Sequence, residues 1–257
     1  MRSYRNKLHE KGFKIGLICN GSRFHRWPMK ELLPMFEWIR VSLDAYDQET
    51  HVRTHGKTAR FKKTVENLKM LADIKKSQNL STTIGAGFIT NQHPDMDRNL
   101  HKFIEICKVS GIDYAQLRPS FGFLFDYKSV DPEELKSIFR RAYEDDSFSV
   151  VVDEGKYEKI LSGQGTCRSY DYCHAQSFKA TTITATGEVY ICCSLTGNKE
   201  GLIGNIKKDS FFDIWHSEKR KSTLDKLDVK KCPHLCVGDS LNEFLDTVKK
   251  VSHRDFL

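Results

Sequence analysis

The sequence lacks the features of several large protein classes. Its longest apolar runs, such as residues 15–19, are far too short to cross a bilayer. Only 6 prolines and 16 glycines occur among 257 residues, and 39% of the residues are apolar, which excludes collagen-like, low-complexity and disordered chains. The basic amino-terminal stretch is followed by no apolar core, so we expect no secretory signal. Neither GxGxxG nor GxxxxGKS/T follows a predicted strand, which disfavours dinucleotide and P-loop sites.

The charge balance of +7 points to a solvated surface more than to a nucleic-acid site. Lysines and arginines are interleaved with acidic residues on predicted helices, so nucleic acid is disfavoured as a partner, while a weak attraction for acidic partners remains open. Eight cysteines without a secretory signal indicate a reducing, cytoplasmic compartment. There, thiols serve as metal ligands or as core residues rather than as disulfides.

The cysteines divide the chain into two regions. Cys19 and Cys107 stand alone in the first 166 residues, and six cysteines lie in the next 70. These six are Cys167, Cys173, Cys192, Cys193, Cys232 and Cys236. We therefore predict a first domain over residues 1–155 and a cysteine-rich second domain over 156–257, joined near the glycine-containing stretch at 153–165.

The first region alternates strands with helices. Period-two patterns predict strands at residues 11–20, 38–45, 81–90, 113–121 and 148–153. Amphipathic patterns predict helices at 58–78, 96–111 and 131–145, and a shorter helical stretch at 30–39 interrupted by a proline. This alternation predicts parallel βα units, arranged as an open sheet or a barrel.

Four polar residues stand at the carboxyl ends of these predicted strands, where parallel βα folds collect their chemistry. They are Asn20, Ser42, Asp44 and Arg118. Each has a structural alternative: Asn20 begins an Asn-Gly turn, Ser42 and Asp44 can cap the next segment, and Arg118 can serve in an ion pair. Because all four recur at strand ends, a binding role for the set is weighed equally with these structural roles.

The second region contains a predicted hairpin with thiols at its ends. Residues 181–191 alternate and turn at Thr186-Gly187, which would bring Cys192 near Cys173. A helix is predicted over 210–227. Cys232 and Cys236 are four residues apart, so they would share one face if that segment is helical.

Three explanations for these thiols compete. Structural zinc usually takes two close pairs of ligands, and only Cys232 and Cys236 form one. An iron–sulfur cluster accepts dispersed thiolates, so it is favoured over zinc and over inert buried cysteines. Cys193 is expected in the core because it alternates with Cys192, while Cys167 is ambiguous. His174 and His234 are expected to face solvent.

The second region resembles the SPASM or shorter twitch domain of radical S-adenosylmethionine (SAM) enzymes. The matching order is Cys173, Gly187, Cys192, residues 204–206 (GNI), residues 212–215 (FDIW), then Cys232 with Cys236. The final pair is spaced CxxxC, one residue longer than the usual CxxC. The resemblance implies one auxiliary [4Fe–4S] cluster held by Cys173, Cys192, Cys232 and Cys236, and the lack of further cysteines after Cys236 favours the twitch arrangement.

The first region resembles the later part of the radical SAM barrel, from its third strand (GLICNG) to its sixth (AQLRPSF). This implies an α/β fold: a partial parallel (β/α) barrel lacking its first strands, followed by a small α+β cysteine-rich domain. It also implies that Ser42 and Asp44 lie near the SAM ribose, Arg118 near the SAM carboxylate, and Asn20 along the same cavity. The intact protein would cleave SAM reductively and abstract hydrogen from a substrate.

One departure from the family is large. The CxxxCxxC motif that binds the SAM-cleaving cluster occurs nowhere in these residues, and neither does the GGE-type segment. We therefore expect an amino-terminally incomplete enzyme, short by two βα units of about 30 residues each. SAM would act as a cofactor only if the missing part is supplied, for example by a partner.

Two alternatives remain open from the sequence. One is a non-catalytic module with a degenerate barrel that binds a peptide or a partner protein, and the other is a zinc-stabilised structural protein. The substrate is not identified by any motif, and a peptide, a sugar and a small molecule are all compatible with the sequence.

Overall fold

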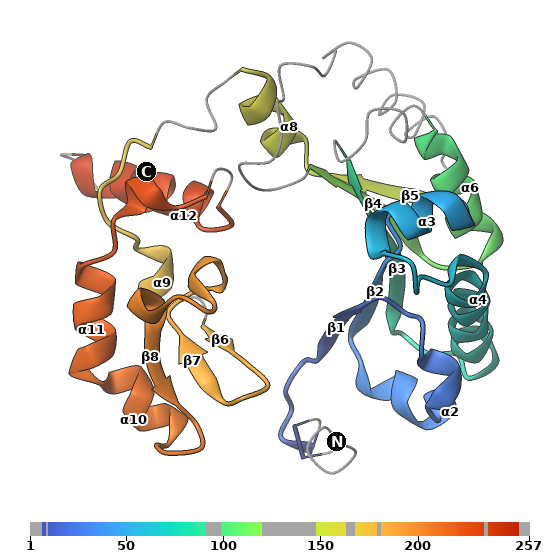
Figure 1. Cartoon of the computed structure of the whole chain (residues 1–257), viewed down its shortest axis with the longest axis horizontal. Coiled ribbons are helices and arrows are strands. Elements are labelled where there is room, and N and C mark those ends of the chain that lie inside the picture. The colour runs from blue at the N-terminus through green and yellow to red at the C-terminus, as the bar shows by residue number, and fades with distance from the viewer. Residues whose placement is uncertain are drawn as a thin grey trace. The chain divides into compact units, whose positions relative to one another are not determined.

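The computed structural model describes residues 7–8, 10–90, 99–119, 148–162, 168–178, 181–233 and 236–251. The chain divides into two compact units: the first ends at Leu161, and the second continues from Ser162 to the carboxyl end (Figure 1). The predicted helix at 131–145, Cys167 and His234 lie outside the described residues.

The first unit is built on a five-stranded parallel sheet whose strands follow the chain order. These strands are β1 (Gly16–Cys19), β2 (Trp38–Ser42), β3 (Thr83–Thr90), β4 (Tyr114–Pro119) and β5 (Ser149–Val152). The predicted α/β class with a partial parallel barrel is confirmed, and the described strands do not close into a complete barrel.

Helices cover one face of this sheet, on which α4 and α6 lie in Figure 1. The helices are α2 (Met29–Leu32), α3 (Gln48–His55), α4 (Phe61–Ser77), α6 (Leu100–Val109) and α8 (Glu154–Leu161), with 3₁₀ turns η1 (Phe24–Arg26) and η2 (Leu33–Met35). Period-two alternation sends Ile39 and Val41 of β2 into the core, where Leu68 and Leu71 of α4 meet them. The opposite face, called the inner face below, carries the alternate residues, which are partly exposed.

The boundaries differ from the predictions in two places. The first strand begins at Gly16 rather than residue 11, because pairing with β2 starts there, and Phe13 is 58% exposed instead of sharing a buried face. Residues 154–161 form helix α8 in the stretch where a linking turn was expected. Cys107 is buried in the core of this unit, and Cys19 is partly buried against that core.

The second unit contains a three-stranded antiparallel sheet, with strand order β6-β7-β8. Its strands are β6 (Thr182–Ile183), β7 (Glu188–Tyr190) and β8 (Leu202–Asn205). The predicted hairpin is confirmed: Gly187 turns the chain with φ +90°, a conformation that favours glycine. Short 3₁₀ turns join the segments at η5 (Cys193–Leu195), η6 (Lys199–Gly201) and η7 (Val229–Lys231).

Helices of the second unit are α9 (Ala175–Phe178), α10 (Phe211–His216), α11 (Glu218–Asp225) and α12 (Asp239–Lys250). The single helix predicted over 210–227 is wrong, because the chain is extended at Ser217. The Ser217 hydroxyl accepts a hydrogen bond from the Arg220 N–H at 3.1 Å and so caps a new helix. Within the described residues, no helix is both long and apolar enough to span a bilayer.

Candidate functional sites

Four thiols of the second unit come from four separate segments. Cys173 precedes α9, Cys192 follows β7, Cys232 follows η7, and Cys236 precedes α12. Cys173 and Cys192 are buried, and the other two are half-buried. The end of the hairpin positions Cys192, and the start of α12 positions Cys236.

The four thiols lie near enough to form a group whose charges act on one another. Burial raises the pKa of Cys232 to about 11, and the neighbouring Cys236, Cys173 and Cys192 thiols add to the shift. Burial likewise raises the pKa of Cys192, with Cys193 and Cys236 adding to the shift, and the pKa of Cys236, with Asp239 and Cys173 adding to it. The positive charge of a bound metal centre would offset the repulsion between the sulfurs and hold them as thiolates. In the described part of the chain, no three His, Cys, Asp or Glu side chains are placed as the ligands of a single ion.

Two donors point at the sulfurs of this group. The Asn242 amide donates to Cys173 Sγ, and the Gly238 N–H donates to Cys236 Sγ, each at 3.5 Å. Asn242 is 1% exposed, and its carbonyl oxygen accepts from the Ala175 N–H at 2.8 Å. Such donors stabilise a negatively charged sulfur, so this surrounding fits a thiolate-bound cluster.

A buried ion pair holds the loop that carries Cys232. Arg168 Nε donates to Asp239 Oδ1 at 3.0 Å, and its Nη atoms donate to the carbonyl oxygens of Cys232 (3.2 Å) and Pro233 (2.6 Å). The Tyr170 hydroxyl donates to the same Asp239 oxygen. Arg168 therefore connects the segment before α9, the Cys232 loop and the start of α12.

The prediction for Cys193 is wrong. Cys193 is exposed rather than buried, because β7 ends at Tyr190 and the chain turns into η5, so strand alternation no longer applies. Cys232 has extended backbone at the end of η7, so the condition for a shared helical face with Cys236 is not met there. His174 is partly exposed, as expected.

In the first unit, Asp44 ties the ends of two strands together. It has φ +46°, its N–H donates to the Gly87 carbonyl at 3.1 Å, and its Oδ1 accepts from the Ile89 N–H at 2.7 Å. Burial raises the pKa of Asp44, and the Ile89 hydrogen bond and the His55, Arg118 and Arg40 charges lower it in part. His55 Nε2 lies 3.6 Å from Asp44 Oδ2.

The other predicted strand-end residues are brought together only in part. Ser42 and Arg118 lie on the inner face with Asp44 at the carboxyl ends of β2 and β4, and the Arg118 charge acts on Asp44. Asn20 is exposed, and its side-chain oxygen accepts from the Ser22 N–H at 3.2 Å and from its hydroxyl at 2.9 Å. These contacts match the turn alternative for Asn20.

Helix α3, which follows Asp44, buries a histidine that gives a pH prediction. His51 is 2% exposed against Phe61 and His55, and burial, followed by the His55 charge, lowers its pKa from 6.5 to about 4. As the pH falls, His51 is protonated in the unfolded chain near pH 6.5 but in the folded chain only near pH 4. Protonation therefore favours the unfolded chain, and the free energy of unfolding falls between about pH 6.5 and about pH 4, by at most about 3 kcal/mol. Urea unfolding at pH 7 and pH 5 should show a smaller difference for His51→Leu than for the unchanged protein, and an equal difference would contradict the assignment.

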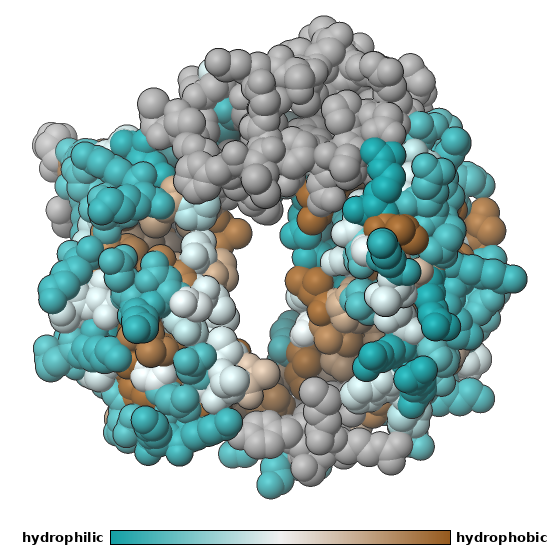
Figure 2. All heavy atoms as spheres, in the orientation of Figure 1, coloured by the Kyte–Doolittle hydropathy of each residue, from teal (hydrophilic) through white to brown (hydrophobic). Residues whose placement is uncertain are grey.

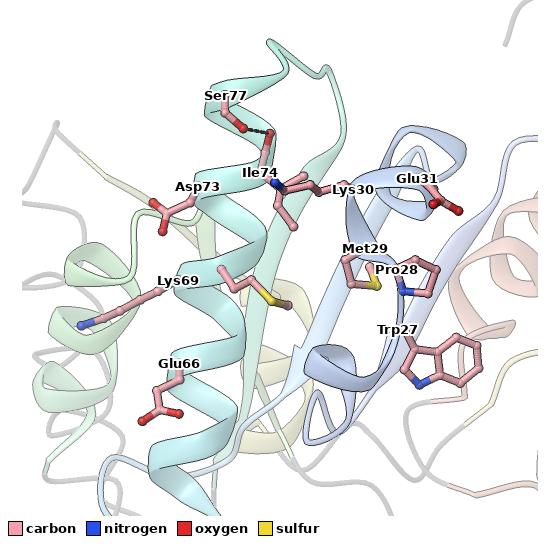
Figure 3. Close-up of a pocket in the computed structure, with 11 residues that line it drawn as sticks. Trp27, Pro28, Met29, Lys30, Glu31, Glu66, Lys69, Asp73, Ile74 and Ser77 are labelled. Carbon is pink, nitrogen blue, oxygen red and sulfur yellow. Dashed lines mark hydrogen bonds between the residues drawn. The ribbon is translucent and has the colours of Figure 1, made fainter.

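One surface pocket is separate from both groups of residues. It lies on the helical side, between the segment around α2 and helix α4, and its lining residues include Trp27, Met29, Glu66 and Lys69 (Figure 3). Neither the strand-end residues nor the cysteines line it. Its mixed acidic and basic rim gives it no evident preference for one ligand charge.

Several residues at these sites could not be recognised from the local sequence. Arg168, Asp239 and Asn242 gather around the thiols from positions up to about 70 residues apart, and no local pattern marks them. The position of Arg40 could be predicted, because Arg40 lies two residues before Ser42 on the same strand and therefore on the same face.

One protein-family model matches most of the second unit. Residues 173–237 match the SPASM family model, described as an iron–sulfur cluster-binding domain. A search of curated proteins finds no match. The match begins at Cys173 and includes the other three grouped thiols.

Over most of its length the chain shares its fold with solved structures of SuiB. SuiB from Streptococcus suis aligns over 84% of this chain and 52% of its own, with TM-score 0.57 and 10% identity. SuiB bound to S-adenosylmethionine aligns over 84% of this chain and 50% of its own, with TM-score 0.56 and 11% identity. The tagged protein anSMEcpe with bound AdoMet aligns over 87% of this chain and 63% of its own, with TM-score 0.49 and 19% identity.

The chain spans about half the length of SuiB. The family match and the shared fold agree with the order of elements, a parallel α/β sheet followed by a cysteine-bearing hairpin unit. Residues 173–237 therefore match the SPASM iron–sulfur family model, and the chain shares the fold of SuiB over 84% of its length.

Proposed function

We propose that this protein binds one auxiliary [4Fe–4S] cluster through Cys173, Cys192, Cys232 and Cys236, as part of a SAM-dependent radical enzyme. The observation that carries the proposal is the gathering of four thiols from separate segments inside a SPASM domain. A bound cluster would supply one-electron chemistry or a site for substrate coordination.

The chain's own residues have distinct parts in this proposal. The four thiols would hold the cluster, Asn242 and Gly238 would donate to its sulfur ligands, and Arg168 would fix the Cys232 loop. Because these partners are buried or half-buried, they also restrict water at the sulfurs. Burial and hydrogen bonding to sulfur are two of the factors that set a cluster's reduction potential.

On the inner face, Ser42, Asp44 and Arg118 are proposed to bind SAM. The fold shared with SAM-bound SuiB supports this position, as do the charges gathered at the strand ends. Arg118 would pair with the SAM carboxylate, because a guanidinium matches its planar geometry. The printed residues contain no CxxxCxxC, so reductive cleavage would need three further thiolates from another source.

Anaerobic reconstitution with iron and sulfide tests the cluster proposal. The full chain should bind about four iron atoms and show broad absorption near ~400 nm, as thiolate-bound clusters do. Metal analysis of the protein as purified anaerobically provides the comparison. Stoichiometric zinc without iron, and no absorption after reconstitution, would contradict the proposal and favour a zinc-stabilised protein.

A further inference from the structure

Two glycines of β3 let side chains of the neighbouring strands β2 and β4 lie across the inner face. Gly85 and Gly87 of β3 lie between these strands in register, next to Arg40 and Ser42 on one side and Tyr114 and Gln116 on the other. The Arg40 side chain lies over Gly87, where an added Cβ would be 3.6 Å from Arg40 Cδ. Arg40 thereby crosses β3 and donates through Nη1 to Gln116 Oε1.

Arg40 is a half-buried cation without a salt-bridge partner in the described part of the chain. Its Nε is inaccessible and has no hydrogen-bond acceptor there, and the same is true of Arg118 Nε. Burial lowers the pKa of Arg40, and the Arg118 charge lowers it further. The carboxylate of Asp44 is close enough to act on both arginines, but it already accepts from Ile89 and faces His55.

Arg40 and Arg118 occupy different depths on this face. Arg118 pairs in register with Ile89 at the strand ends, whereas Arg40 contacts Gln116, two residues earlier on β4. Two residues of strand correspond to about 7 Å. The deeper position therefore has its own donors: Arg40 Nη2, which makes no hydrogen bond within the described residues, and the amide nitrogen of Gln116.

Aromatic rings flank this deeper position. The Tyr114 ring lies over Gly85 and the Trp38 ring over Gly16, since a Cβ on either glycine would come within about 2.3 Å of ring atoms. Ile18 and Val151, on the same face, are 51% and 41% exposed. In Figure 2 hydrophobic atoms gather on the strand side of this unit, while the helical side is mostly hydrophilic.

We propose that Arg40 and Gln116 bind a carboxylate of the substrate, whose apolar part lies on the Trp38 and Tyr114 rings. A half-buried guanidinium without a charged partner is costly, and a carboxylate could accept from Arg40 Nη2 with one oxygen and from the Gln116 amide nitrogen with the other. The inference rests on the proposed function in taking the inner face as the substrate side. It narrows the substrate to a carboxylate-bearing organic molecule and separates this position from the SAM carboxylate at Arg118.

The test uses the full chain and two probes of similar shape, 3-phenylpropionate and its uncharged amide, with binding measured by calorimetry. The acid should bind at least about tenfold more tightly than the amide, because only the carboxylate forms charge-assisted hydrogen bonds with the guanidinium. Arg40→Met should remove this preference, and Arg40→Lys should keep part of it. Lys69→Met, which removes a charge on the helical side, should leave it unchanged.

Labelled SAM binding is measured on the same variants. Equal affinity for acid and amide, or an unchanged preference in Arg40→Met, would overturn the inference. It would also be overturned if SAM competes with the acid and Arg40→Met weakens both equally, because the site would then belong to SAM. Absence of SAM binding with the acid preference intact would count against the proposed SAM site alone.

Discussion

Replacing Cys192 with alanine should abolish the visible absorption of the reconstituted protein, while replacing its neighbour Cys193 should leave it intact. Cys192 is buried and lies in the group with Cys232 and Cys236, whereas Cys193 is exposed in η5. A [4Fe–4S] cluster needs four ligands, so iron in Cys192→Ala should fall below about a quarter of the amount in the unchanged protein. Iron and sulfide assays with absorption spectra measure this difference.

The two variants are closely matched because each removes one thiol from adjacent positions. Titration of total thiols in denaturant should show the same loss for both, which confirms that the samples differ only in position. Equal iron contents in the two variants would rule out Cys192 as a ligand. Loss of iron from Cys193→Ala alone would instead reverse the assignment.

Arg168→Met is expected to destabilise the second unit by about 3–5 kcal/mol, the usual cost of breaking a buried ion pair. The Arg168 side chain is 5% exposed, and its removal leaves the Asp239 carboxylate without its cation and two carbonyl oxygens without their donor. Hydrogen exchange of the α12 amides should rise accordingly, since it reports stability in that unit separately.

Two further variants separate charge burial from general damage. Lys221→Met removes an exposed ion pair with Glu218, whose side chains are 60% and 85% exposed, and should change stability by less than about 1 kcal/mol. Adding Asp239→Asn to Arg168→Met should recover part of the loss, because the uncompensated charge is gone. An Arg168→Met protein with unchanged exchange in α12 would show that the ion pair does not hold the unit together.

The spacing of apolar residues was sufficient to predict most strands and helices of the first unit. Ile39 and Val41 alternate with polar residues on β2, and Leu68 and Leu71 follow the helical repeat of α4, so both elements and their buried faces could be predicted. The short first strand could not, because Phe13 continues the alternation while its backbone does not pair with β2. Alternation marks a face, but pairing with a neighbouring strand decides where the strand begins.

The thiol site was predictable for a different reason. Cys173, Cys192, Cys232 and Cys236 match a family pattern, so their grouping was expected without knowledge of their surroundings. Arg168 and Asn242 were not predictable, since a buried arginine or asparagine has the same local sequence features as an exposed one. Only the fold brings Arg168 to Cys232 and Asn242 to Cys173.

Asp44 combines a backbone shape with a charge, and substitutions there will mix the two unless they are chosen to separate them. Its left-handed φ suits asparagine and glycine better than alanine, and its Oδ1 accepts from the Ile89 N–H near the end of β3. An alanine at this position alters strand geometry and electrostatics together. Asparagine keeps the conformation and the hydrogen-bond acceptor, so it isolates what the negative charge contributes beside Arg40 and Arg118.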